Sequence, residues 1–233
     1  MGKVFAGVNP IATLDAFFTD AKQGTLPNLC LIDPDFTAND DHPSHDVRLG
    51  QAFIASVYKA LAASPQWSRC LFVITYDEHG GFFDHVPPPK CADELEDFRQ
   101  LGFRVPSIVV GPTVRRGHVH SVQLEHSSVA ATLATRFGIA NLSDRMRGAN
   151  HLSSTIDPRL VDHPLPPPPS PLAVEPPGQQ ALTTDGVVSS QPELDRMIAT
   201  GAIPAHLVDR RTRPERLRAW MRHSERLGVF SGR

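Results

Sequence analysis

The sequence predicts an α/β fold in which helices flank a mainly parallel sheet, and three observations support this prediction. Residues 70–76, CLFVITY, form an almost wholly apolar run rich in β-branched and aromatic side chains, as expected of a strand buried on both faces. Residues 105–110 form a second run of this kind. Residues 46–63 and 127–137 show the apolar spacing of amphipathic helices. Strands that alternate with helices along a chain are typical of a parallel sheet covered by helices.

The segment before CLFVITY contains one more predicted helix and one more predicted strand. Residues 11–22 have apolar side chains at helical spacing, and Gly24 marks the end of that helix. Residues 28–32 form a short apolar run that predicts a buried strand. The polar residues 33–46 are rich in turn formers and predict a loop. Asp46 is well placed to cap the helix that follows this loop.

Composition divides the chain into three predicted parts. Residues 1–160 carry the strands and helices of the main domain. Residues 161–190 contain the run PLPPPPSPLAVEPPG, which predicts a stiff, extended linker and has the chemistry of a ligand for SH3-like domains. Residues 191–233 predict a tail with two short helices, at 193–200 and 214–227.

The helix predicted at residues 214–227 is rich in arginine, which allows two interpretations. Its arginines could contact anionic lipid or nucleic acid. However, Glu215 and Glu225 interrupt the positive charge, and the net charge of the whole chain is −2. We therefore favour a helix that packs on the main domain through apolar side chains such as Leu217 and Trp220.

Bulk composition limits the classes of function. With 40% hydrophobic and 21% charged residues among 233, the chain can form a packed core. Its small net charge gives no indication of nucleic-acid binding. Three widely spaced cysteines do not make a disulfide framework. No apolar run reaches the roughly 18 residues that a membrane-spanning helix needs. No signal peptide follows Met1, and the sequence leaves the cellular location open.

The segment TYDEHGGFFDHVPPP, residues 75–89, carries the strongest indication of chemistry. Asp77 and Glu78 directly follow a predicted strand. Neighbouring side chains of a strand point to opposite faces, so the two carboxylates can share a cation only where the backbone turns. Gly80 and Gly81 allow such a turn. Because ligands of open α/β sheets bind at the carboxyl ends of strands, we predict that Asp77 and Glu78 bind a divalent metal ion.

The remaining polar side chains of this segment bear on the choice of metal. Carboxylate oxygens favour calcium, magnesium or manganese, whereas added ligands from His79 and His85 would shift the preference toward zinc or iron. The sequence leaves these alternatives open. The competing interpretation is a polar surface loop without a ligand. The preceding strand, the paired glycines and the two histidines favour a site over that interpretation.

A second polar cluster, NDDHPSHD at residues 39–46, follows the strand predicted before it. Asp40 and Asp41 are ordinary turn residues, and Asp46 serves as a helix cap. His42 stands in an acidic turn before a proline. Its imidazole could donate a hydrogen bond to a phosphoryl oxygen or protonate a leaving alkoxide. The sequence favours neither this catalytic role nor a simple turn role for His42.

A third cluster, EHSS at residues 125–128, directly precedes a predicted helix. One interpretation is ordinary capping by Ser127, with His126 exposed. The other is an anion or metal site that involves His126, because the free N–H groups of a helix N-terminus favour negative charge. Both interpretations stay open.

Taken in order, these motifs resemble a known family. TYDEHGGFFDHVPPP is similar to the signature of the bacterial phosphoesterase family that contains phospholipases C and certain acid phosphatases. The similarity extends to four further segments in the same order: DDHPSHDV, SPQW, RVPSIVVGP and EHSS. The resemblance covers residues 5–150 and includes every polar cluster described above.

The resemblance implies an alkaline phosphatase-like fold, with a central sheet between helices, and metal-dependent hydrolysis of phosphoesters. Asp77 and Glu78 match the acidic pair that binds the catalytic metal. His42 matches a histidine near the phosphate that assists departure of the leaving group. Three more catalytic candidates fall in matching motifs: His79, His85 and His126. Members of the family are often exported, although this sequence shows no export signal.

The first half of the family's domain is expected to lie outside this chain. That half carries a Glu-Asn pair that completes the metal site and a Ser or Thr nucleophile, and neither motif occurs here. We therefore expect a truncated phosphoric ester hydrolase that acts on phospholipids or other phosphoesters and has a missing N-terminal half as its partner. The alternative is a non-catalytic remnant that binds metal or a partner. In either case the sheet is incomplete and has exposed edges.

Overall fold

The computed structural model describes residues 12–36, 38–43, 45–170, 173–178, 196–197, 199–202 and 212–230. The chain forms two compact units, and each is described by itself. The first unit combines the residues up to Trp67 with those from Pro168 onward, and the second comprises residues 68–167. The predicted division at residues 160 and 190 stays a prediction.

Helix α1, Leu14–Gln23, lies in the first unit. It begins where the Thr13 hydroxyl accepts a hydrogen bond from the Ala16 N–H at 3.3 Å. It ends at Gly24, whose φ of 75° closes the helix. The predicted helix and its glycine end are confirmed, although residue 11 lies outside the described residues.

Helix α2, Val47–Ala62, follows the predicted loop. The Asp46 carboxylate accepts the Arg48 N–H at 3.1 Å, which confirms the predicted cap. Apolar side chains at helical spacing give the helix a broad buried face. Its fully or almost fully buried apolar residues are Leu49, Ala52, Phe53, Ala55, Val57, Tyr58 and Leu61.

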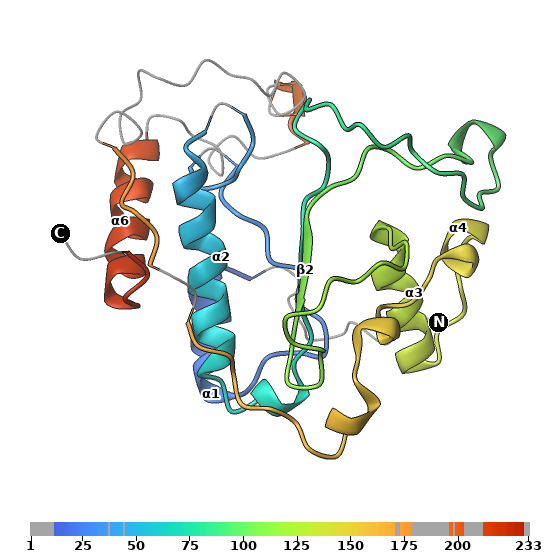
Figure 1. The fold of residues 1–233 in the computed structure, drawn as a ribbon. Helices are drawn as coiled ribbons and strands as arrows, with labels where there is room; N and C mark the ends of the chain where they lie inside the picture. Colours follow the sequence, from blue (N-terminus) through green and yellow to red (C-terminus); the bar gives the residue numbers. More distant parts are fainter. Residues whose placement is uncertain are drawn as a thin grey trace. The chain divides into compact units, whose positions relative to one another are not determined.

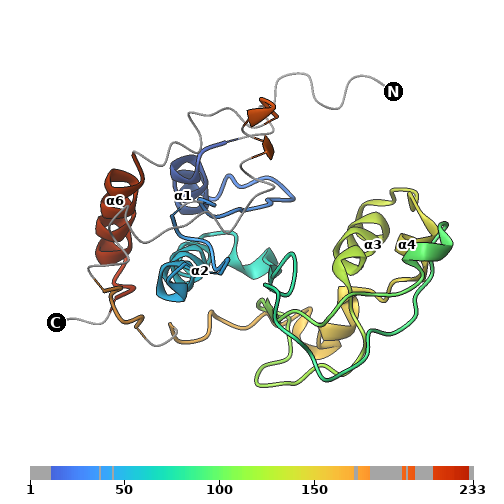
Figure 2. The same ribbon diagram turned by 90° about the horizontal axis from the view of Figure 1, so that it is seen from above.

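Helix α6, Arg213–Arg226, packs alongside α2 in the first unit (Figures 1 and 2). Leu217 is fully buried and forms a cluster with Ala38 and Leu49. The buried Ser224 hydroxyl lies 3.3 Å from the Ser56 hydroxyl, which satisfies polar groups inside the helix interface. The prediction that this helix packs through apolar side chains is confirmed.

The described residues of the proline-rich segment from Pro168 onward also pack within the first unit. The Tyr58 hydroxyl donates to the Pro168 carbonyl at 2.7 Å, and the Val174 N–H donates to the Val229 carbonyl at 2.8 Å. Residues 171–172 and 179–190 lie outside the described residues, as does half of the helix predicted at 193–200.

The second unit contains strands β1, Phe72–Thr75, and β2, Ser107–Val110. They pair antiparallel, with Phe72 opposite Val110 and Thr75 opposite Ser107. The predicted parallel arrangement is therefore wrong for this pair. Parallel strands need a crossover connection, usually an α-helix. The connection here contains only the short 3-10 helix Glu96–Phe98, so the chain returns in the opposite direction.

The burial of the predicted strands also differs from expectation. No residue of β1 or β2 is buried in this structure, and Ile108 is 57% exposed. The strand predicted at residues 28–32 is not formed, and Leu31 there is 87% exposed. An apolar run forms a buried strand only when a neighbour covers it. Among the described residues, these runs lack such cover.

Two helices complete the second unit: α3, His126–Phe137, and α4, Asp144–Gly148 (Figure 2). They pack through a small cluster of Ala131, Ala134, Met146 and Ala149. Helix α3 confirms the prediction at residues 127–137. Further 3-10 helices in the chain are Trp67–Arg69, Leu152–Thr155 and Pro158–Leu160.

The described part of the chain is thus a mixture of helices and a small two-stranded sheet, which agrees with the α/β class at a coarse level. None of the described helices combines the length and apolar composition that a membrane span requires.

Candidate active site

The chain turns sharply just after β1, as the glycine pair predicts. Gly80 and Gly81 have φ angles of 66° and 77°, in the left-handed region that glycine adopts readily. The Glu78 carboxylate accepts the Gly80 N–H at 2.7 Å, which fixes that side chain over the turn. Asp77 and Glu78 are both exposed to solvent. The carboxyl end of β1 therefore carries two accessible carboxylates on a tight turn.

These two carboxylates have the right donor chemistry for a hard divalent cation but do not complete a site. Within the described ranges, no three His, Cys, Asp or Glu side chains are grouped closely enough to hold a metal ion. A stable calcium site takes about six to eight oxygen ligands. Asp77 and Glu78 could thus supply only part of a coordination shell, and their predicted role stays a prediction.

His79 is fixed by the backbone of the same turn. Its Nδ1 lies 2.9 Å from the Phe82 carbonyl oxygen, and its ring packs edge to face on Phe103 at 5.0 Å between centroids. A carbonyl oxygen only accepts hydrogen bonds, so Nδ1 is the donor. In the neutral ring, Nε2 then carries the lone pair and can accept a proton.

His126 reaches the end of β1 from a distant part of the sequence. It is the first residue of α3, and its Nε2 lies 2.8 Å from the carbonyl oxygen of Tyr76, 50 residues earlier. Nε2 is the donor here, which leaves the Nδ1 lone pair of the neutral ring available. The structure therefore brings the EHSS motif against the residue that directly precedes Asp77.

The start of α3 is capped differently from the sequence prediction. Glu125, not Ser127, is the N-cap residue. The Ser128 hydroxyl accepts the Glu125 N–H at 3.0 Å, and the Ser128 N–H donates to the Glu125 carbonyl at 2.9 Å. Ser128 is completely buried. These two reciprocal hydrogen bonds fix the first turn of α3 and therefore the direction in which the His126 side chain extends from it.

Asp84 forms a bidentate ion pair with Arg104. The guanidinium Nε and Nη2 donate to the carboxylate at 2.7 and 2.8 Å. This hydrogen bonding, helped by the Val86 N–H, holds the pKa of Asp84 far below its ordinary value. Both oxygens of the Asp84 carboxylate therefore accept hydrogen bonds from Arg104. Sequence reasoning missed Arg104, because no local pattern connects residues 20 positions apart.

His85 and His42 differ from the other two histidines. The His85 side chain is 87% exposed, and its Nδ1 is 3.6 Å from an Asp84 oxygen. His42 belongs to the first unit, where its Nδ1 donates to the Pro43 carbonyl at 2.6 Å. Close by in the sequence, the buried Asp40 carboxylate contacts the His45 ring. The predicted catalytic roles of His42, His79, His85 and His126 stay predictions.

The carboxyl end of β1 thus carries two exposed carboxylates on a glycine turn, with His79 on the same turn and the His126 ring hydrogen-bonded to the Tyr76 carbonyl. The family model named "Phosphoesterase family" matches residues 4–140. The chain therefore belongs to the phosphoesterase family.

Similar proteins come from a plant and from bacteria. The chain is 43% identical over 150 residues to Non-specific phospholipase C6 of Arabidopsis thaliana, which covers 54% of this chain and 29% of that protein. It is 42% identical over 166 residues to Non-specific phospholipase C4 of the same plant, covering 60% and 31%. Phospholipase C B of Mycobacterium tuberculosis (strain ATCC 25618 / H37Rv) is 30% identical over 153 residues, covering 57% and 29%. The chain thus spans about a third of the length of these relatives.

Proposed function

We propose that this chain is part of a hydrolase that cleaves phospholipid phosphoesters in the manner of a phospholipase C. Membership of the phosphoesterase family and relatives named as phospholipases C support this proposal. One observation on the chain itself carries it. His126 is hydrogen-bonded to the Tyr76 carbonyl, so an imidazole from α3 stands at the carboxyl end of β1, where Asp77 and Glu78 are exposed.

In this proposal, Asp77 and Glu78 bind a divalent cation. When bound, such a cation withdraws negative charge from phosphoryl oxygens. The carboxylate oxygens favour calcium, magnesium or manganese, and an imidazole ligand would favour zinc. The Glu78 side chain is already ordered by its hydrogen bond to the Gly80 N–H, which reduces the entropy lost when it binds a cation.

The histidines hold and move protons in the proposed reaction. His79 and His126 each donate to a backbone carbonyl through one ring nitrogen, which leaves the other nitrogen to accept a proton. His42 is held by the Pro43 carbonyl in the same way, and we assign it the protonation of the leaving alkoxide. His85 is exposed and not tied to the backbone, so we assign it a role in contacts with the substrate.

The remaining parts of the site are proposed to lie in further polypeptide, such as the N-terminal half implied by the family resemblance. That polypeptide would supply additional metal ligands and the nucleophile. It would also extend β1 and β2 into the larger, mainly parallel sheet of an alkaline phosphatase-like fold. Two findings support this proposal: the matched residues cover 29–31% of three relatives, and the apolar side chains of both strands are at most partly buried, with Ile108 of β2 57% exposed.

A metal-binding experiment tests the carboxylate pair directly. Mn²⁺ is added to the ¹⁵N-labelled chain, and paramagnetic broadening of backbone amide signals is recorded. We expect selective broadening at residues 77–81, and its loss when Asp77→Asn and Glu78→Gln are combined. Asp162→Asn, an exposed carboxylate of the same unit, is the matched control. Equal broadening in all three proteins would overturn the metal role of Asp77 and Glu78.

A turnover experiment tests the reaction and its substrate. Release of the phosphorylated head group is measured from vesicles of phosphatidylcholine, phosphatidylinositol or sphingomyelin, and p-nitrophenyl phosphate serves as a monoester. Hydrolysis of a phospholipid that disappears in Asp77→Asn supports the phospholipase C reaction. Hydrolysis of the monoester alone indicates an acid phosphatase instead.

A second candidate function is that of a non-catalytic module that binds metal or a partner. The feature that favours it is that the nucleophile motif implied by the family resemblance does not occur in this sequence. Mn²⁺ binding at Asp77 and Glu78 without turnover of any of the four substrates would support this candidate and contradict the enzyme.

A further inference from the structure

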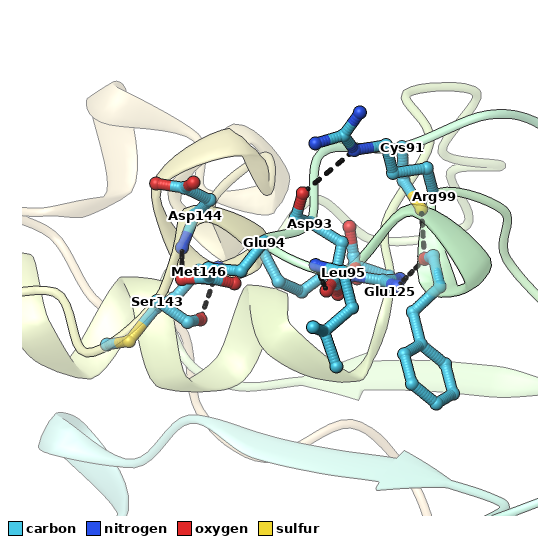
Figure 3. Close-up of polar contacts among 11 residues, drawn as sticks. Cys91, Asp93, Glu94, Leu95, Arg99, Glu125, Ser143, Asp144 and Met146 are labelled. Carbon is cyan, nitrogen blue, oxygen red and sulfur yellow. Dashed lines mark hydrogen bonds and ion pairs between the residues drawn. The ribbon is translucent and has the colours of Figure 1, made fainter.

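Arg145 of α4 connects three segments that are far apart in the sequence. Its Nε donates to the Asp93 carboxylate at 3.0 Å, and its Nη1 lies 3.3 Å from the Glu125 carboxylate. Its Nη2 also donates to the Phe98 carbonyl. The side chains of all three charged residues are at most 19% exposed. Figure 3 shows the surroundings, with labelled residues of the loop at 91–99, Glu125, and Ser143, Asp144 and Met146 around the start of α4.

The electrostatic setting makes these contacts strong. Burial acts to lower the pKa of Arg145, but the hydrogen bonds to Asp93 and Glu125 and the negative charge of Glu125 act against burial, and the pKa is raised. Charge-assisted hydrogen bonds in a partly buried site are about twice as strong as neutral ones. A single guanidinium that donates in three directions suits a planar, rigid arginine and not a flexible lysine.

Hydrogen bonds within the loop at residues 91–99 hold the groups that Arg145 contacts in place. The Asp93 carboxylate accepts the Leu95 N–H at 2.9 Å, and the Arg99 Nε donates to the Asp93 carbonyl at 3.0 Å (Figure 3). An antiparallel bridge between Lys90 and Gln100 closes the loop. Asp93 and Phe98 on the loop and Glu125 at the start of α3 therefore hold the Arg145 side chain in place.

Glu125 connects Arg145 to the proposed active site through the start of α3. It is the N-cap of α3, and its backbone N–H donates to the Ser128 hydroxyl. The next residue, His126, donates to the Tyr76 carbonyl at the end of β1. When the Glu125 side chain is held in place, the first turn of α3 is held as well. The backbone of His126, from which the imidazole extends, is part of that turn.

We propose that Arg145 is a positioning residue, which holds Glu125 and the N-terminus of α3 so that His126 stays against the carboxyl end of β1. This inference rests on the proposed function only in calling that place an active site. Arg145 touches neither Asp77 nor His126 in the contacts described, so it acts through Glu125.

Amide hydrogen exchange in the intact chain tests the positioning role without any assay of activity. We expect the amides of Glu125 and Ser128 to exchange about tenfold faster in Arg145→Gln, because a charge-assisted hydrogen bond to their turn is lost. Amides of the β1–β2 pair should keep their wild-type rates. The matched control is Arg147→Gln, two positions along α4, which removes only an exposed pair with Asp144. Unchanged exchange at Glu125 and Ser128 would overturn the proposal.

A second variant covers the case in which Arg145→Gln loosens the whole unit. Glu125→Gln keeps the shape of the side chain and removes only the charge that Arg145 contacts. Faster exchange confined to the first turn of α3, with a weaker nuclear Overhauser contact between the His126 ring and Tyr76, supports positioning. Exchange that rises equally in the β1–β2 amides, or not at all, contradicts it.

Turnover separates this inference from the proposed function. In the active protein, Arg145→Gln should lower kcat about 10- to 100-fold with little change in KM. The reason is that displacement of a catalytic group slows the chemical step more than it weakens substrate binding. Arg145→Lys should recover part of the loss. Faster exchange at Glu125 with unchanged kcat would leave the positioning role intact and would overturn the proposed role of His126.

Discussion

The helix pair α2–α6 and the turn that follows β1 are stabilised in different ways. Helix α2 buries nine of its 16 residues, whereas no residue of β1 or β2 is buried. The helix pair depends on apolar area removed from water, at about 25 cal/mol per Å². The turn depends on hydrogen bonds between polar groups, such as those of Glu78, His79 and His126. The helix pair α2–α6 therefore tolerates little loss of side-chain volume, whereas the turn after β1 tolerates little change of backbone direction.

The largest expected effect is loss of volume in the helix pair. Leu217 is fully buried between α6 and α2, so Leu217→Ala should lower the free energy of unfolding by about 3 kcal/mol. Urea denaturation followed by circular dichroism measures this change. Arg218→Ala, one position along on the exposed face, should change it by less than about 0.5 kcal/mol. Similar values for the two variants would show that α6 contributes little to the core.

The next effect concerns Gly111 in the second unit, where the backbone of the chain after β2 lies close to the backbone at Cys70. A Cβ atom at Gly111, just after β2, would lie 2.6 Å from the backbone carbonyl oxygen of Cys70. Because the Cys70 backbone can move away only at an energetic cost, Gly111→Ala should lower the free energy of unfolding by about 2 kcal/mol. Gly102→Ala is the control, since a Cβ there meets nothing within 4 Å. A stable Gly111→Ala protein would mean that the strand pair is looser than its register suggests.

A smaller effect tests the turn itself. Gly81 has a φ of 77°, and a Cβ atom added there would meet no other atom within 4 Å. Gly81→Ala therefore introduces only backbone strain, of about 1 kcal/mol. Thermal unfolding, with Gly102→Ala again as control, gives the cost. If the variant also loses Mn²⁺ broadening at residues 77–81, the turn sets the direction of both carboxylates; wild-type broadening would show that it does not.

The smallest effect is a pH dependence of the helix pair. Burial, with the nearby charge of Arg226, lowers the pKa of His223, and Asp15 opposes this shift. The unfolded chain therefore binds a proton more readily than the folded chain. Stability is fully present above the ordinary histidine pKa of about 6.5 and falls as pH drops below it. The melting temperature should decrease from pH 7 to pH 5, and less so in His223→Phe. An equal decrease in both proteins would assign the effect to other groups.

Local sequence predicted the helices and the position of the turn well. Helices α1, α2, α3 and α6 follow from apolar spacing, and the ends of the first two follow from Gly24 and Asp46. Gly80 and Gly81 predicted the turn because a left-handed backbone favours glycine. Each of these signals lies within a few residues of the feature that it specifies.

The sequence by itself thus determined helices α1, α2, α3 and α6 and the glycine turn where β1 ends. Only the tertiary structure decided how β1 and β2 pair, how little of them is covered, and which distant groups meet. The ion pair between Asp84 and Arg104, the three contacts of Arg145, and the bond from His126 to Tyr76 join residues 20 to 52 positions apart. The physical reason is that periodicity reports one element's own surface, whereas a hydrogen bond between elements depends on where the whole backbone brings its donor and acceptor.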